Sequence, residues 1–245
     1  MHLHDRSTVA ILDWLAAIGA GSAGELAASC GPSLRATSAR LRALEDAGLT
    51  RSLRLLHGAP ALHVLTRRGL RAAGRPELDP VAVSASGFAH LLAVARVAVA
   101  LGNAGQRVGG ERELRALERA EGRPLASAEV GLAHDGTVAL HRPDLVCWGA
   151  GAPIAIEVEL TVKAPARLQT IVRGWARSRL VGGVVYYTVP RPRRCWGKPV
   201  FTGSSDRWGT LGDAANGGRL SRDCRAPRAT FHPLRPQSRT GPIIP

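Results

Sequence analysis

The feature that most constrains this chain is a short stretch, residues 154–161, in which apolar side chains occupy every second position. It reads Ile-Ala-Ile-Glu-Val-Glu-Leu-Thr. Successive side chains of a β-strand point to opposite faces, so the large apolar side chains share one face. The carboxylates of Glu157 and Glu159 share the other face, about 7 Å apart along the strand. We therefore predict a strand with one core face and one acidic face.

The residues around this strand predict an α/β domain over residues 85–190. A stretch that is apolar nearly all round predicts a buried helix, and periodicity predicts the remaining elements. From residue 111 the predicted order is helix, strand, strand, helix, strand. The predicted elements are helices over 88–101, 111–121 and 168–179 and strands over 145–148, 154–161 and 181–189.

Two carboxylates on one covered face repel each other and lose solvation. A bound cation would remove this conflict, and Asp144, at the start of the neighbouring strand, would complete a three-carboxylate site with Glu157 and Glu159. Mg²⁺, with Mn²⁺ as a substitute, suits such ligands and binds phosphate, so the site predicts attack on a phosphodiester. Lys163 has the same strand parity as the glutamates, and if the strand runs on that far its ammonium would stabilise transition-state charge or orient water.

The N-terminal part, residues 7–74, predicts helix, helix, helix, hairpin and a last short helix. Ser7 or Thr8 is expected to cap the first helix, Ser22 and Glu25 form a capping box, and Thr66 caps the last helix. The third helix runs from Ser33 to about Ala47, with leucines at 34, 41 and 44 expected to point inward.

This N-terminal order resembles a winged helix–turn–helix domain, and the stretch from Thr37 to Leu49 is similar to that family's recognition helix and the start of its wing. The resemblance implies that the third helix enters the major groove of double-stranded DNA and that the wing flanks it. The residues expected to contact or border DNA are Arg35, Thr37, Ser38, Arg40, Arg42, Arg51 and Arg54. An ordinary solvated arginine face, or a fold that binds a protein partner, is the alternative.

The formal net charge of +14 is unevenly distributed. Residues 1–76 contribute +5, residues 77–190 contribute +1 and residues 191–245 contribute +8. Such a balance indicates a polyanionic partner. Two prolines mark residues 75–84 as a linker. The segment 191–245 is expected to be a basic, disordered tail, with an altered reading frame at the end of the gene as the alternative.

The acidic motif resembles the PD-(D/E)XK nuclease superfamily. Pro143-Asp144 and then Glu157-Val158-Glu159 stand where that superfamily has its PD and (D/E)-x-K, although Glu159 replaces the usual lysine. The resemblance implies that Asp144, Glu157 and Glu159 are catalytic and bind metal. It also implies that Lys163 takes the role of the lysine and that Glu111, or Glu113, matches an acidic residue of the first core helix.

Over residues 7–190 the chain resembles the replication-relaxation family of bacterial plasmid and mobile-element proteins. This implies a DNA-binding role in replication or relaxation, with plasmid replication or mobilisation proteins and a second copy of the chain as further partners. Two functions stay open: a Mg²⁺-dependent endonuclease or nickase, and a non-catalytic DNA-binding replication or transcription factor with a degenerate nuclease-like domain. An antitoxin-like interaction protein is a third class.

Location and membrane association are also constrained by the residues. No window reaches the roughly 18 consecutive apolar residues of a membrane helix, and the first residues lack the apolar core of a signal peptide. The four cysteines form no Cys-x-x-Cys pair, which disfavours a zinc ribbon and a disulfide framework. We therefore expect a cytoplasmic protein without a membrane partner.

Overall fold

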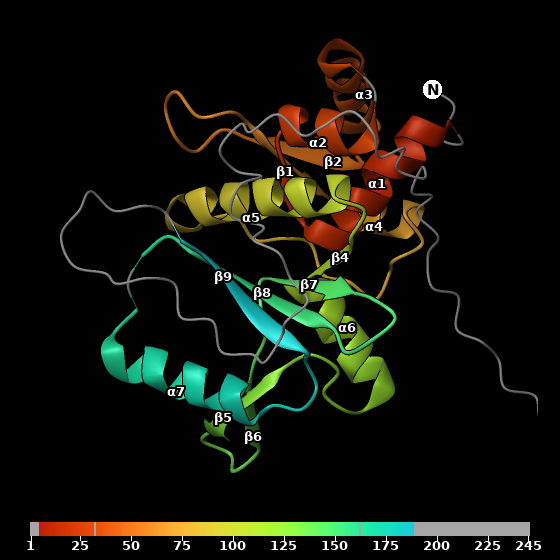
Figure 1. Cartoon of the computed structure of the whole chain (residues 1–245). Helices are drawn as coiled ribbons and strands as arrows, with labels where there is room; N and C mark the ends of the chain where they lie inside the picture. The colour runs from red at the N-terminus through yellow and green to blue at the C-terminus, as the bar shows by residue number, and fades with distance from the viewer. Residues whose placement is uncertain (1–4, 32, 162, 189–245) are drawn as a thin grey trace, which may run out of the picture. The chain divides into compact units, whose positions relative to one another are not determined.

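The computed structural model describes residues 5–31, 33–161 and 163–188. The predicted tail over residues 191–245 lies outside the described residues. The described residues form a mixed α and β fold with seven helices and small sheets (Figure 1). This agrees with the predicted combination of helices and strands.

The N-terminal region consists of helices followed by a hairpin. Its elements are α1 (Arg6–Ile18), β1 (Ala20–Gly21), α2 (Ala23–Cys30), α3 (Leu34–Asp46), β2 (Thr50–Leu53), β3 (Leu62–Leu65) and α4 (Arg67–Ala72). The strand order is β1-β3-β2, with both pairs antiparallel. The two-residue β1 was not predicted, because a strand of that length carries no periodicity.

The predicted caps of α2 and α4 are confirmed, and α3 begins directly after Ser33, the predicted start of that helix. Ser22 and Glu25 form the capping box of α2, Ser33 caps α3 and Thr66 caps α4. The prediction for α1 is wrong, since its N-cap is Asp5 rather than Ser7 or Thr8. The Asp5 side chain does not cap the helix, and its carboxylate accepts a hydrogen bond from Arg40 instead.

The buried face of α3 differs from the prediction at one position. Leu41 and Leu44 are buried as expected, but Leu34 is 57% exposed and Thr37 is 0% exposed. Leu34 is the first residue of the helix, where it has no neighbouring element to cover it. The inward face therefore starts one turn later, at Thr37, and continues with residues four and seven positions further on.

The second region contains a mixed sheet. Its elements are α5 (Ala85–Asn103), β4 (Arg107–Gly110), α6 (Glu111–Glu121), β5 (Ala128–Leu132), β6 (Val138–His141), β7 (Leu145–Trp148), β8 (Ile154–Glu159), α7 (Pro165–Arg177) and β9 (Gly183–Thr188). The sheet order is β4-β7-β8-β9. Only β8 and β9 are parallel, and α7 forms the crossover that such a pair needs.

The five elements predicted from residue 111 occur in the predicted succession, but the prediction missed β5 and β6 among them and β4 just before residue 111. β4 reads Arg-Val-Gly-Gly, and its two glycines leave no alternating pattern. β5 and β6 form a separate hairpin with a register shift between Glu129 and Gly131. That irregularity interrupts the two-residue period by which a strand is recognised.

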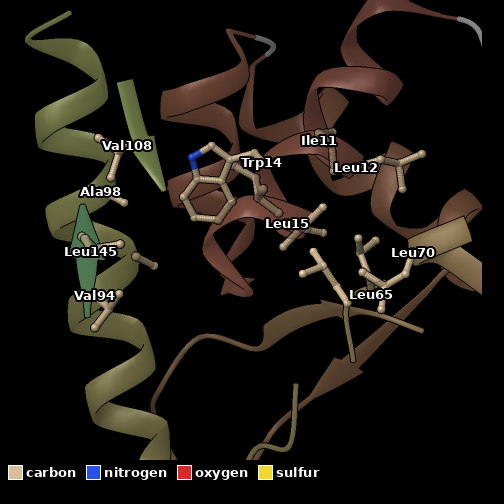
Figure 2. Packing of buried hydrophobic residues seen from close by; sticks show 14 of the residues in the cluster. Ile11, Leu12, Trp14, Leu15, Leu65, Leu70, Val94, Ala98, Val108 and Leu145 are labelled. Carbon is tan, nitrogen blue, oxygen red and sulfur yellow. The ribbon is translucent and has the colours of Figure 1, made fainter. Parts of the chain in front are cut away.

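One apolar cluster draws on both regions. Trp14 and Leu15 of α1 belong to the same core as Val94 and Ala98 of α5 and Leu145 of β7 (Figure 2). The predicted linker over residues 75–84 contains no helix or strand, yet its Leu78 is 2% exposed and joins this core. The segment between the regions is thus anchored by an apolar side chain.

Helix α5 is the only helix in the described ranges whose length and composition would allow it to cross a membrane. The apolar side chains of this helix are explained by packing, because α5 contacts α2 and β1 as well as β4 and β8. Phe88, Leu92 and Ala95 are among its buried residues. The helix has the contacts expected of a core helix, as predicted for residues 88–101.

Candidate functional site

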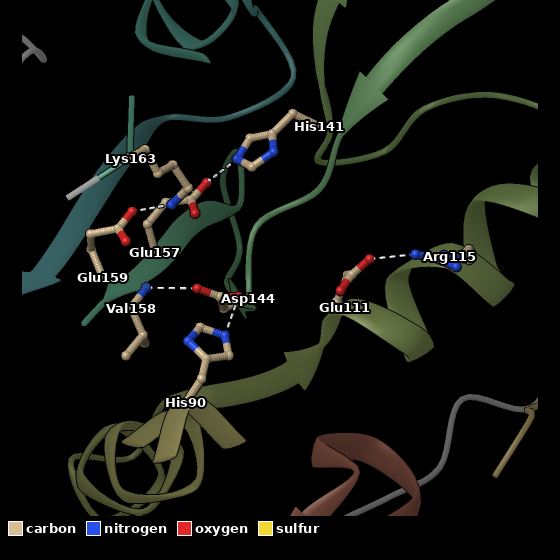
Figure 3. Close-up of polar contacts among 9 residues, drawn as sticks. All are labelled: His90, Glu111, Arg115, His141, Asp144, Glu157, Val158, Glu159 and Lys163. Atoms are coloured by element: carbon tan, nitrogen blue, oxygen red, sulfur yellow. Dashed lines mark hydrogen bonds and ion pairs between the residues drawn. The ribbon is translucent and has the colours of Figure 1, made fainter. Parts of the chain in front are cut away.

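All five predicted catalytic residues line one pocket of about 570 Å³. They are Glu111, Asp144, Glu157, Glu159 and Lys163. They come from the start of α6, the approach to β7, the end of β8 and the turn before α7 (Figure 3). The tertiary fold therefore brings together residues that are up to 52 positions apart in the chain.

Asp144 is held between β8 and α5. Its Oδ2 accepts a hydrogen bond from the backbone N–H of Val158 at 2.7 Å, and its Oδ1 lies 3.0 Å from Nε2 of His90. The hydrogen bond to Asp144 raises the pKa of His90, although burial acts in the opposite direction. Because β7 and β8 pair Leu145 with Ile156, Asp144 lies next to this pair on the side of Glu157.

Glu157 is 3% exposed and is supported by two side chains. Its Oε1 lies 2.7 Å from Nε2 of His141 and accepts a hydrogen bond from Nε1 of Trp175 at 3.1 Å. The two aromatic rings meet edge to face with centroids 5.8 Å apart. Buried charges need such partners, so His141 at the end of β6 and Trp175 of α7 keep this carboxylate in place.

The remaining acidic residues also have basic partners. Lys163 donates to Glu159 from the turn before α7, because β8 ends at Glu159 and the predicted strand does not continue to Lys163. The backbone N–H of Glu111 donates to the carbonyl of Asp144 at 3.1 Å, and its side chain pairs with Arg115. Acidic side chains in the pocket therefore lie beside basic ones.

The donor chemistry suits a hard cation, since the pocket presents carboxylate oxygens. Both hydrogen bonds of Glu157 fall on Oε1, and Oε2 makes none with the described residues. The hydroxyl of Tyr186, opposite Glu157 on β9, is buried without a partner in the described part of the chain. Burial and the charges of Glu157 and Glu159 raise the pKa of Tyr186. In those same ranges no three His, Cys, Asp or Glu side chains form a ready ligand group.

The residues predicted to contact DNA differ in how far they are exposed to solvent. Arg35, Arg42, Arg51 and Arg54 are exposed, and Ser38 is half-buried. Arg40 forms an ion pair with Asp5 at 2.7 Å. Thr37 is fully buried, so the expectation that it borders the DNA-facing surface is corrected: its position on α3 points into the core.

Several polar residues at the pocket were not predicted. His141 pairs with Glu157, a contact that the sequence pattern does not indicate. His90 is the one histidine in a strongly apolar helix, which is a signal that could have found it. Glu118, 5% exposed, accepts from the backbone N–H of Leu125 at 3.0 Å and from Nε of Arg142 at 2.8 Å, and so fixes the residues before Asp144.

No family model matches this chain, and no curated protein or solved structure matches it at a significant level.

Proposed function

We propose that this chain is a DNA-binding protein whose second region acts on the phosphodiester backbone with Mg²⁺, or Mn²⁺ in its place, during replication or relaxation of a plasmid or mobile element. The observation that carries the proposal is the single pocket lined by Asp144, Glu157, Glu159 and Lys163. Carboxylates that converge on one pocket beside a lysine are suited to a phosphate-containing substrate.

The N-terminal region supports the DNA-binding part. Three helices followed by an antiparallel hairpin are in the order of a winged helix–turn–helix domain. Arg35 and Arg42 are exposed on α3, and Arg51 and Arg54 are exposed on or beside β2. In such a domain these side chains face the major groove and the flanking backbone.

The second region supports the nuclease-like part. A sheet in the order β4-β7-β8-β9, with one parallel pair joined through α7, is compatible with a PD-(D/E)XK arrangement. Asp144, Glu157 and Glu159 would hold the cation, which supplies Lewis-acid activation of a phosphate when bound. His90 orients Asp144, and His141 and Trp175 orient Glu157.

The test is nicking of supercoiled plasmid in Mg²⁺, Mn²⁺ or EDTA by wild type and by the Asp144→Asn/Glu157→Gln double variant. We expect metal-dependent nicking by wild type and a loss of at least about 100-fold in the double variant, because two ligands are lost. Glu129→Gln, at an exposed position on β5, is the matched control and is expected to retain activity.

One observation favours a second function, a non-catalytic DNA-binding factor. Asp144, Glu157 and Glu159 each already have a basic or N–H partner in the protein, so the pocket is stable without a cation. Salt-sensitive DNA binding without nicking in any metal would establish this second function and contradict the nuclease.

A further inference from the structure

The second region has a net charge near zero, but its acidic and basic residues lie in different parts of its sequence. Residues 77–159 carry 7 basic and 11 acidic side chains, whereas residues 160–188 carry five basic and no acidic ones. The five are Lys163, Arg167, Arg173, Arg177 and Arg179. Lys163 pairs with Glu159 in the pocket, which leaves four arginines on and just after α7.

These four arginines, the α7 arginine patch, are all exposed. Ile171, Gly174 and Trp175 bury one face of α7; Arg173 and Arg177 lie on the opposite face, and Arg167 is exposed in the first turn. None of the four forms an ion pair within the described residues. Glu129 of β5, the strand on which α7 packs, forms none there either.

Only one arginine of the patch is placed to favour the helix: Arg177 lies in the last turn, where a cation complements the helix dipole. Arg167 lies in the first turn, where a cation opposes the helix dipole. Arg173 and Arg177 are four residues apart, where like charges repel each other. An uncompensated cluster that costs local stability is better explained by a polyanion that it binds.

The chemistry of the patch favours the phosphates of DNA over other polyanionic surfaces. Arginine matches phosphate geometry with paired N–H donors. A helix that lies in a membrane surface needs an exposed apolar face. Ile171 and Trp175 of α7 point into the protein, and Val172, 39% exposed, is a single apolar side chain rather than a face. The chain's own C-terminal segment is unsuitable, because residues 191–245 have a net charge of +8.

We propose that the α7 arginine patch binds the sugar-phosphate backbone of DNA next to the acidic pocket. The patch and the pocket share α7, since Trp175 on its buried face donates to Glu157 at 3.1 Å. DNA would then contact α3 and the hairpin in the N-terminal region and a second, sequence-independent surface on α7. This inference rests on the proposed DNA-binding function.

The test measures binding of the full chain to a fluorescent duplex of mixed sequence, in EDTA, between about 50 and 200 mM salt. We expect Arg173→Ala/Arg177→Ala to weaken binding roughly tenfold and to reduce the slope of log K against log salt by about 2, close to 1 for each lost phosphate contact. Arg173→Lys/Arg177→Lys is expected to keep most of the slope. Arg67→Ala/Arg96→Ala removes the same charge from two exposed arginines that are already paired with Asp79 and Glu25.

The outcomes separate the two proposals. In one outcome, Arg173→Ala/Arg177→Ala and the paired-arginine control both keep the wild-type salt slope, while Arg35→Ala/Arg42→Ala lowers the affinity for DNA. The proposal for the α7 arginine patch is then wrong, and the proposed DNA-binding function stands. A wild-type chain that does not bind the duplex overturns both. Equal losses in the patch variant and the paired-arginine control would show a net-charge effect and overturn the patch. Binding to phosphatidylserine vesicles that the patch variant loses, with its DNA binding unchanged, would assign the patch to a membrane surface and also overturn the proposal.

Discussion

The two regions of this protein use charged side chains in different ways. In the N-terminal region the ion pairs of Asp5 and Glu25 are partly exposed, and Glu25 also completes the cap of its own helix. In the second region Glu118 and Glu157 are almost completely buried and are held by partners from other elements. The partners of Asp5 and Glu25 are also distant in the chain, so the difference between the regions is one of burial: the acidic side chains of the second region are removed from water and depend on their protein partners.

The largest test of this comparison is Glu118→Ala. It leaves the backbone N–H of Leu125, the hydroxyl of Ser127 and the guanidinium of Arg142 without their shared acceptor. Breaking a buried charge pair costs about 3–5 kcal/mol, so we expect a loss of that size in the free energy of unfolding measured in urea. Glu121→Ala, exposed on the same helix, should change it by less than about 0.5 kcal/mol. Similar small effects at both sites would contradict the contrast between the regions.

The corresponding test in the N-terminal region is Ser22→Ala. The variant removes the side chain that accepts from the backbone N–H of Gly24 and ends the capping box with Glu25. Loss of such a cap typically costs about 1 kcal/mol, so the effect should be several-fold smaller than that of Glu118→Ala. Ser22→Thr keeps a hydroxyl at the cap and should restore most of the difference. A loss equal to that of Glu118→Ala would contradict the expectation that a buried carboxylate contributes more to stability than a neutral helix cap.

The smallest expected effect is a pH dependence of opposite sign in the two regions. Burial lowers the pKa of His63 on β3 below 6.5, the charge of Arg54 lowers it further, and Glu45 acts against both. The folded state therefore favours neutral His63. Its contribution to stability is complete above pH 6.5 and declines as the pH falls through the folded pKa. The raised pKa of His90 gives the reverse, a contribution complete below pH 6.5 and lost as the pH rises through the folded pKa.

Urea unfolding of His63→Gln and His90→Gln between about pH 5 and pH 8, in EDTA, measures this difference. Relative to wild type, His63→Gln should be least harmful at the acid end, and His90→Gln should be least harmful at the alkaline end. If the loss of unfolding free energy changed with pH in the same direction in both variants, the opposite pKa shifts of His63 and His90 would be contradicted. Wild type at each pH is the reference.

Sequence-based prediction succeeded in both regions where the signal lies within a few residues of the chain. Ser22 and Thr66 were identified as caps, and Ser33 as the start of a helix, because each signal lies within four residues of its partner. The bounds of β7 and α6 were also correct, since β7 is a short continuous apolar run and the leucines of α6 have helical spacing. Leu34 was misplaced because the period of a helix shows its phase but not where its neighbours end.

By itself, the sequence determined the succession of the longer helices and strands and the shared face of Glu157 and Glu159, because side-chain direction follows from backbone periodicity. Only the tertiary structure decided which groups meet them: His90 reaches Asp144 across 54 positions, and Trp175 reaches Glu157 across 18. It also decided that Thr37 is buried and that β4 joins the sheet. These outcomes depend on packing between distant elements, and the burial of each polar group is settled only when its partners are in place.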